Sequence, residues 1–219
     1  MNTVLFDMDG TIFDTEQISY DCWAKAIKDM RLPIDLDDLI EDMYGLNSHT
    51  FEIFFCNRFG ADFPACELIA LRERYTVESI ESGGLPLKPG VPRVFEELRA
   101  LGCRMGLVSS TVCEVIERYL ILAGMEGIFD TIVGGDSVQK GKPEPFCYLL
   151  AAERLGVDPK DCIVVEDSKN GVLAGSRAGM RTVLIPDRQR PDAESLAHST
   201  YQLSTLESLA ELVRQIQEA

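Results

Sequence analysis

The sequence predicts an α/β fold in which a parallel sheet forms the core and a helical segment is inserted after the first strand. Three observations predict it. Four helical patterns in the second part of the chain are each followed by a glycine, short apolar runs follow these glycines, and a long N-terminal stretch contains helical patterns without a convincing strand. Strands that alternate with helices form βαβ crossovers, which build parallel sheets.

The first expected strand covers Thr3–Phe6. This run is short and mainly apolar, which suits a strand that is covered on both faces. The stretch that follows contains amphipathic helical segments near 16–30, 36–43, 49–58 and 65–81. Glycines and prolines between 83 and 90 form a turn-rich exit from it. We therefore expect two domains: residues 1–14 and 87–219 form the α/β core, and residues 15–86 form the helical insertion.

The rest of the chain alternates regularly. Apolar residues at three- and four-residue spacing predict helices over 91–101, 112–123, 144–155 and 170–178. The glycine after each helix adopts the left-handed conformation that ends many helices: Gly102, Gly124, Gly156 and Gly179. Short apolar runs predict strands at Met105–Val108, Thr131–Val133, Ile163–Val165 and Thr182–Ile185. A capping-box pattern at 204–207 predicts the start of a last helix.

The charge of the chain restricts its partners. Formal net charge is −15 over 219 residues, and mean hydropathy is zero. Such an excess of carboxylates repels nucleic acid and anionic lipid, so we expect neither nucleic acid nor membrane as a partner. A phosphorylated substrate would be repelled as well. Any anion site must therefore be built locally from backbone amides, a lysine and a cation.

The cysteines and histidines restrict the compartment and the kind of metal site. Seven cysteines form an odd set without a CxxC pair, which favours buried free thiols in a reducing compartment. We find neither a charged-then-apolar leader nor an apolar run of the roughly 20 residues that span a bilayer, so we expect a cytoplasmic protein. The two histidines, His49 and His198, are far apart in sequence, which argues against a His-rich metal site.

The strongest chemical signal is the DMDGT motif at 7–11, directly after the first strand. Ligands of open parallel sheets bind beyond the carboxyl ends of strands. Gly10 allows the loop to curl and to expose backbone amides to an anion. Because the carboxylates of Asp7 and Asp9 would repel each other, we expect a cation beside them. An acidic capping turn is the alternative, but the position directly after an apolar strand disfavours it.

A second pair of acids, Glu166 and Asp167, ends the strand expected at 163–165 and precedes Ser168. Carboxylates at a neighbouring strand end could complete an oxygen-ligand site for Mg²⁺. Asp167 or Ser168 could instead cap the following helix. The two roles are compatible, and this motif alone does not separate them.

Two further motifs are ambiguous when taken singly. Residues 109–111, Ser-Ser-Thr, end one strand and open a helix, where hydroxyls and amides either bind an anion or cap the helix. Lys142 lies beside Pro143 and Pro145, which stiffen the segment, although a solvated lysine is the commoner role. Together the four motifs place acids, a hydroxyl and a lysine at one edge of the sheet. Phosphoryl transfer requires such a set.

The four motifs resemble those of the haloacid dehalogenase superfamily, in its β-phosphoglucomutase-like phosphatase branch. They occur in family order: DMDGT at 7–11, Ser109 after GLV, GKPEP with Lys142, and VVEDSKNG at 164–171. The resemblance implies a Rossmann-like parallel core with an all-helical cap inserted at about 15–86, and a monomer. It also implies a Mg²⁺-dependent phosphatase that hydrolyses small phosphorylated metabolites, sugar phosphates in particular, through an aspartyl phosphate.

The same resemblance implies a role for each motif residue. Asp7 would be the nucleophile, and Asp9 would protonate the leaving oxygen and then activate water. Mg²⁺ would be held by the Asp7 side chain, the Asp9 backbone carbonyl and Asp167. Glu166 would stand beside these ligands, through water. The groups expected to bind the phosphoryl oxygens are Gly10, Thr11, Ser109, Ser110 and Lys142.

Two departures from the resemblance favour hydrolysis over phosphomutase chemistry. A mutase grips a second phosphate on its cap, for which we would expect an Arg three positions after Gly45 and a His at position 19. The chain has Ser48 and Ser19 there. His49 and Arg58 could compensate, but surface roles explain them more simply. A β-phosphoglucomutase-like phosphomutase is the main alternative, and a non-enzymatic, receiver-like phospho-switch is a weaker one.

Overall fold

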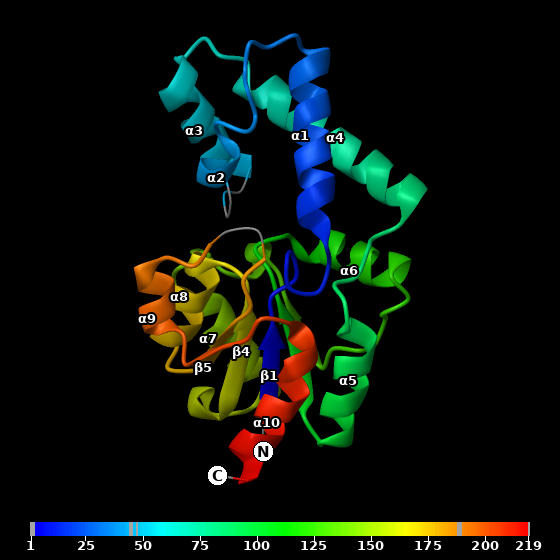
Figure 1. Cartoon of the computed structure of the whole chain (residues 1–219), viewed down its shortest axis with the longest axis vertical. Coiled ribbons are helices and arrows are strands. Elements are labelled where there is room, and N and C mark those ends of the chain that lie inside the picture. The colour runs from blue at the N-terminus through cyan, green and yellow to red at the C-terminus, as the bar shows by residue number, and fades with distance from the viewer. Residues whose placement is uncertain (1–2, 44–45, 47, 188–189, 219) are drawn as a thin grey trace. The chain divides into compact units, whose positions relative to one another are not determined.

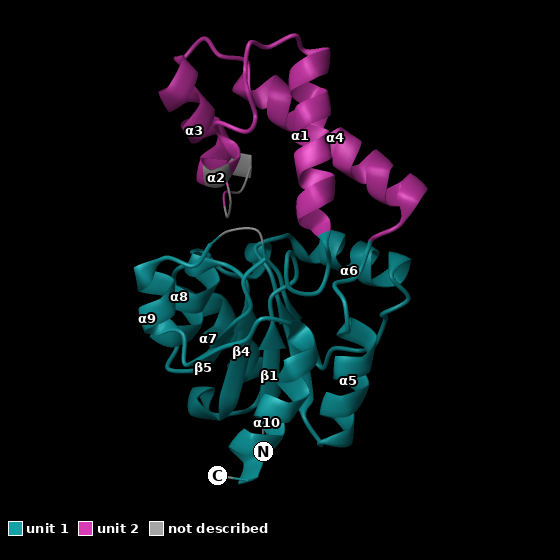
Figure 2. Cartoon of the chain, in the orientation of Figure 1, with its two compact units in different colours: residues 1–14, 86–219 teal, residues 15–85 magenta. Residues whose placement is uncertain are grey.

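The structure, a computed structural model, describes residues 3–43, 46, 48–187 and 190–218. The chain forms two compact units (Figure 2). Unit 1 comprises residues 1–14 and 86–219, and unit 2 comprises residues 15–85. Unit 1 contains every described strand, whereas the described elements of unit 2 are all helices.

Unit 1 is built on a six-stranded sheet in which every pair of neighbouring strands is parallel, which confirms the predicted fold class. The strands are β1 (Thr3–Phe6), β2 (Arg104–Val108), β3 (Thr131–Val133), β4 (Cys162–Glu166), β5 (Arg181–Leu184) and β6 (Tyr201–Gln202). Their order is β3-β2-β1-β4-β5-β6. The chain therefore changes direction across the sheet between β1 and β4. Open sheets of this kind bind ligands at such a switch point, outside the carboxyl ends of the strands.

Helices cover both faces of this sheet (Figure 1). Successive residues of a strand point to opposite faces. Leu5 of β1 accordingly packs in a core with Tyr148 of α7 (Phe146–Leu155) and Ala174 of α8 (Lys169–Arg177). Phe6 instead lies edge-on to Phe95 of α5 (Val91–Ala100), with ring centroids 5.0 Å apart.

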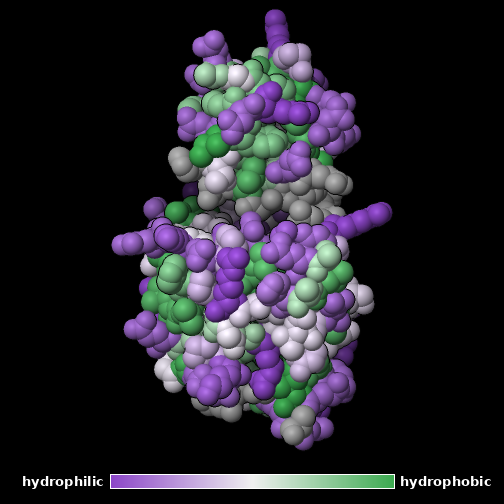
Figure 3. All heavy atoms as spheres, turned by 90° about the vertical axis from the view of Figure 1, so that its left-hand side faces the viewer, coloured by the Kyte–Doolittle hydropathy of each residue, from purple (hydrophilic) through white to green (hydrophobic). Residues whose placement is uncertain are grey.

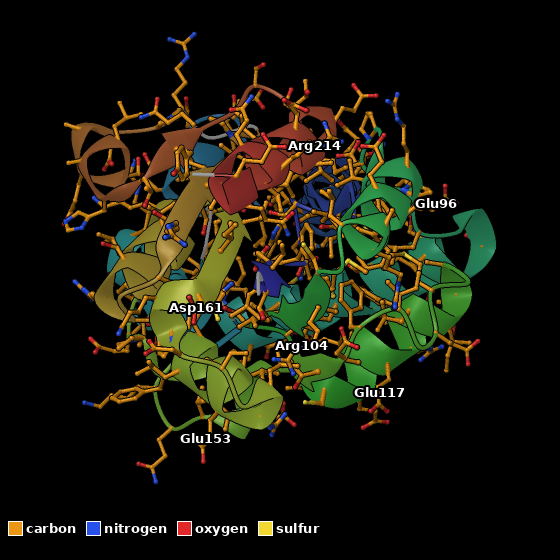
Figure 4. The ribbon with its side chains drawn as sticks, turned by 90° about the horizontal axis from the view of Figure 1, so that it is seen from below. Glu96, Arg104, Glu117, Glu153, Asp161 and Arg214 are labelled. Carbon is orange, nitrogen blue, oxygen red and sulfur yellow. The ribbon has the colours of Figure 1, made fainter. Side chains whose placement is uncertain are left out.

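The view along the sheet shows the same two layers. Figure 4 places the helices of Glu96 and Arg214 on one side of the strands and the helix of Glu153 on the other. These helices are α5, α10 (Leu209–Glu218) and α7. The remaining helices of unit 1 are α6 (Cys113–Leu122), α9 (Ala193–His198) and three single 3₁₀ turns at Gly135–Ser137, Pro159–Asp161 and Leu206–Ser208. Helix α9 and strand β6 were not predicted, because a six-residue helix and a two-residue strand carry almost no periodic signal.

Unit 2 consists of α1 (Thr15–Asp29), α2 (Ile40–Met43), α3 (Ser48–Phe59) and α4 (Ala65–Gly83). Its core is aromatic, with the Trp23 ring 5.0 Å from Phe51 and 5.5 Å from Phe55. The helix expected over 36–43 forms only at its end, as α2. Gly45 and the side chains of Ser48 and His49 lie outside the described residues, so the departure from the mutase pattern at that position stays a prediction.

Two general features of the chain bear on its surroundings. All seven cysteines are free. Among the described residues, no helix combines the length and hydrophobicity that crossing a bilayer requires. Figure 3 shows hydrophilic side chains spread over the visible face of each unit.

Candidate active site

The ends of β1, β2 and β4 carry the predicted site residues, and Lys142 joins them. Its ammonium donates to Asp7 Oδ1 at 2.5 Å, to Glu166 Oε1 at 2.6 Å and to the Val108 carbonyl at 3.1 Å. Exposed fractions of the Lys142, Asp7 and Glu166 side chains are 6%, 12% and 0%. Lys142 is therefore a buried cation held between three adjacent strand ends and not a solvated surface lysine.

The carboxylate of Glu166 is bonded on both oxygens. Besides Lys142, Oε1 accepts from the Tyr148 hydroxyl at 2.7 Å. Oε2 accepts from the Ser168 hydroxyl at 2.9 Å and from the Ser168 amide at 3.3 Å. Gly171 allows this arrangement, because a Cβ there would lie 1.8 Å from the Glu166 carboxyl carbon. Sequence reasoning missed Tyr148, whose position in an apolar helical run indicated only core packing.

The cap of α8 resolves the ambiguity of its motif. The Ser168 hydroxyl accepts from the Gly171 amide at 3.1 Å, so Ser168 is the capping residue. Asp167 does not fill that role, and one of its oxygens lies within 4.8 Å of carboxylate oxygens of both Asp7 and Glu166. Ser168 therefore caps the helix, and the Asp167 carboxylate belongs to the acidic cluster.

Charge is unbalanced in this cluster. Burial raises the pKa of Asp7 well above its usual value, and the carboxylate of Glu166 adds to the rise. Burial also opposes the charged form of Lys142, but Asp7 and Glu166 outweigh it and raise the pKa of its ammonium well above the usual value. The carboxylates of Asp7, Glu166 and Asp167 thus lie together, and the Lys142 ammonium donates to the first two. A divalent cation would offset the excess, and an all-oxygen set of this kind fits Mg²⁺.

The DMDGT loop curls over its own backbone. Gly10 has φ +77°, and its amide donates to the Phe13 carbonyl at 2.9 Å, so this amide is used within the loop. A Cβ on Gly10 would lie 2.2 Å from Asp167 Oδ2, which explains why the loop needs glycine there. Within the described part of the chain, the amides of Met8 and Thr11 donate to no backbone carbonyl, and the buried Thr11 hydroxyl has no partner. Such groups can receive an anion.

The segment after β2 is ordered by side chains and a neighbouring loop. Ser109 is 3% exposed, and its hydroxyl accepts from the Thr111 amide at 3.0 Å. The Thr111 hydroxyl donates to Asp9 Oδ2 at 3.3 Å, whereas Ser110 is exposed. No side-chain cap from this segment begins α6. Asp136, from the loop after β3, accepts from the first helical amide instead, at 2.9 Å.

Comparison with known proteins gives a consistent family. A model of haloacid dehalogenase-like hydrolases matches residues 1–179. A phosphorylated carbohydrates phosphatase of Thermotoga maritima is 32% identical over 184 residues, which cover 84% of each chain. Hexitol phosphatase B of Escherichia coli K12 is 28% identical over 209 residues, which cover 94% of this chain and 92% of that protein.

Solved structures agree on the fold. The crystal structure of CbbY from Rhodobacter sphaeroides superposes with a TM-score of 0.80 at 24% identity and covers 95% of this chain and 96% of its own. That of β-phosphoglucomutase from Clostridium difficile has a TM-score of 0.79 at 22% identity and covers 98% of this chain and 96% of its own. At these identities the likeness establishes the architecture.

Proposed function

We infer that this phosphatase, which belongs to the haloacid dehalogenase-like hydrolase family, acts on small phosphorylated metabolites through a phosphorylated Asp7 and depends on Mg²⁺. The observation that carries the proposal is the buried Lys142 ammonium, held 2.5 Å from Asp7 and 2.6 Å from Glu166 at the switch point of the sheet. A fixed cation beside a strand-end carboxylate suits a nucleophile that must meet an anionic phosphoryl group.

Asp7 acts as the nucleophile. One of its carboxylate oxygens attacks phosphorus, and the bond from phosphorus to the substrate's oxygen breaks. Lys142 stays protonated because its pKa is raised, so its ammonium can donate to a phosphoryl oxygen at that point. Glu166, bonded to Lys142, Tyr148 and Ser168, keeps the ammonium in place.

Asp9 moves the protons. It gives a proton to the leaving oxygen, and it then takes one from the water molecule that attacks the phosphorylated Asp7. This second attack releases inorganic phosphate and restores both carboxyl groups. The Thr111 hydroxyl, which donates to Asp9 Oδ2, holds this carboxyl group in orientation.

Anion and cation sites are shared among backbone and side chains. The unengaged amides of Met8 and Thr11, with the buried hydroxyl of Ser109, support phosphoryl binding. Gly10 contributes the shape of the loop. The side chains of Asp7 and Asp167 with the Asp9 carbonyl would hold Mg²⁺, and Glu166 stands behind them. Bound Mg²⁺ would supply Lewis-acid stabilisation of the phosphoryl charge.

The proposed partners follow from charge and architecture. We propose a small-molecule substrate selected by unit 2 as the cap, a monomeric protein, and no nucleic-acid or membrane partner. The net charge of −15 supports the exclusion of polyanions. Seven free cysteines support a reducing compartment such as the cytoplasm.

The test is phosphate release from a panel of hexose, pentose and sugar-acid phosphates, with Mg²⁺ and with EDTA. Asp7→Asn is the matched control, because it keeps the shape of the side chain and removes the nucleophile. We expect Mg²⁺-dependent release from at least one substrate by the native chain alone. Equal rates for the native chain and the variant on every substrate would contradict the proposal.

One observation favours the phosphomutase alternative. A mutase needs a cation on its cap to grip a second phosphate, and unit 2 contains a partly buried arginine, Arg72. In unit 2, Arg72 donates to the Ser19 hydroxyl at 2.7 Å and lies 5.3 Å from the centre of the Trp23 ring. Sequence reasoning did not single out this cation. Formation of glucose 6-phosphate from β-glucose 1-phosphate with a bisphosphate primer would establish mutase activity. A phosphorylated Asp7 that lasts for hours would instead support the receiver-like switch.

A further inference from the structure

Unit 1 contains a second lysine that is partly buried and paired with carboxylates, Lys88, which neither the sequence motifs nor the proposed reaction uses. The Lys88 ammonium donates to Asp187 Oδ1 at 2.5 Å and to Asp14 Oδ1 at 3.3 Å. The side chains of Lys88 and Asp187 are only 17% and 15% exposed, whereas that of Asp14 is 42% exposed. Burial opposes the charge on Lys88, but the hydrogen bond to Asp187 and both carboxylates outweigh it and raise the pKa of the ammonium.

Backbone pairing fixes both partners of this ion pair. The Lys88 amide donates to the Ile12 carbonyl and the Asp14 amide to the Pro86 carbonyl, both at 2.8 Å. Segment 86–88 thereby runs antiparallel to residues 12–14, which follow the DMDGT motif. Asp187 follows β5, whose continuation pairs with β4 through the Ile185 amide and the Glu166 carbonyl at 2.8 Å. Asp187 thus leaves the sheet next to β4, which ends at Glu166, directly before Asp167.

The second oxygen of Asp187 is the unusual feature. Oδ2 is buried and has no hydrogen-bond partner among the described residues. It lies 3.5 Å from the point where a Cβ on Gly10 would stand, and Asp167 Oδ2 lies 2.2 Å from the same point. Two carboxylate oxygens therefore converge on the space that Gly10 leaves open, and Lys88 contacts the other oxygen of Asp187.

Such a convergence is unfavourable unless a positive or donating group joins it. A buried acceptor without a donor keeps an uncompensated desolvation cost, which is larger when the acceptor is charged. Like charges at close range add to that cost. A hydrated divalent cation beside Asp167 would supply the donor that Asp187 Oδ2 lacks, because Mg²⁺ keeps several of its waters in protein sites.

We propose that Asp187 is a further carboxylate of the cation site, held by Lys88 so that its Oδ2 accepts a hydrogen bond from the hydrated ion beside Asp167. The inference rests on the proposed Mg²⁺ dependence and extends the set of residues that serve it. Asp187 acts through the ion and is a positioning residue. Lys88 sets the orientation of its carboxylate and limits the net negative charge that the ion meets.

The test measures ion binding directly. Mn²⁺ binding followed by electron paramagnetic resonance, and Tm as a function of Mg²⁺, are compared for the native chain, Asp187→Asn and Asp187→Ser. Asp161→Asn is the control, because it removes the same charge from an exposed position just before β4, at the opposite end of that strand. We expect both Asp187 variants to bind Mn²⁺ about 10-fold more weakly or worse, the range typical of groups that orient a metal site, and Asp161→Asn to match the native chain.

The metal-free Tm separates this role from a structural one. With EDTA, Asp187→Asn should lower Tm, because it weakens the pair with Lys88 and leaves the more exposed Asp14 as the charged partner of that ammonium; the loss should be larger with Mg²⁺ than with EDTA. A lower Tm with and without Mg²⁺, at unchanged Mn²⁺ affinity, would show that Asp187 only braces Lys88 and would overturn the inference. Native affinity in both Asp187 variants would overturn it as well. Absence of any Mg²⁺ or Mn²⁺ response in the native chain would instead overturn the proposed metal dependence, and this inference with it.

Discussion

The variant Tyr148→Phe removes one hydroxyl and tests whether the hydrogen bonds of Glu166 stabilise the site. Tyr148 and Glu166 are both 0% exposed, and their oxygens are 2.7 Å apart. The variant deletes one hydrogen bond to a charged acceptor, which contributes about 1.5–3 kcal/mol. Glu166 Oε1 keeps its bond from Lys142, so the variant leaves no unpaired carboxylate oxygen and no larger loss is expected.

Native-state hydrogen exchange of the β1 and β4 amides measures this loss within unit 1. We expect the free energy of opening to fall by about 1.5–3 kcal/mol, and by only about 0.5–1.5 kcal/mol when Glu166→Gln is already present, because the acceptor is then neutral. Tyr75→Phe is the control, since its hydroxyl bonds Asp29 at 2.7 Å on an exposed surface of unit 2, and the β1 and β4 amides should exchange as in the native chain. A loss below about 0.5 kcal/mol, or an equal loss in both backgrounds, would refute the reasoning.

Three further predictions concern the same unit. Lys142→Met leaves the Asp7 and Glu166 carboxylates without their cation, so urea denaturation in EDTA should show a loss of about 3–5 kcal/mol; an unchanged midpoint would contradict it. Gly171→Ala places a Cβ 1.8 Å from the Glu166 carboxyl carbon, so Tm and phosphate release should both fall although alanine favours helices. Asp192 should titrate with a pKa of about 2 by carbon NMR, because the Lys169 ammonium and the Ser195 amide donate to its carboxylate. Since the folded pKa lies below the unfolded value of about 3.9, the carboxylate stabilises the fold above about pH 3.9, and this stabilisation is lost as pH falls toward 2.

Local sequence patterns predicted the elements of the core closely. The strand expected at Thr131–Val133 has those bounds, and that expected at Ile163–Val165 lies within β4. Strands and helices follow from hydrophobic spacing over a few residues, and their alternation then dictates a parallel sheet. The segment 36–43 was less well predicted, since only its last four residues form a helix. Residues 36–39 share the amphipathic spacing but form a turn, because spacing alone does not specify where a helix begins.

The motifs likewise predicted which residues meet, but not how each is used. Asp7, Lys142 and Glu166 were expected at one edge of the sheet, and hydrogen bonds join them. The roles of Ser168 and Asp167 stayed open until the structure showed Ser168 as the cap of α8. The distinction depends on side-chain direction, which a local pattern does not specify.

The sequence by itself determined the alternation of strands and helices from β1 to β5, the family and the residues that gather at the strand ends. Each of these is encoded in short stretches of chain. Only the tertiary structure decided that the Tyr148 hydroxyl donates to Glu166 and that the unpartnered oxygen of Asp187 lies near Gly10. The physical reason is distance along the chain: Lys142 reaches Asp7 across 135 positions and Lys88 reaches Asp187 across 99, and no local periodicity records such pairings.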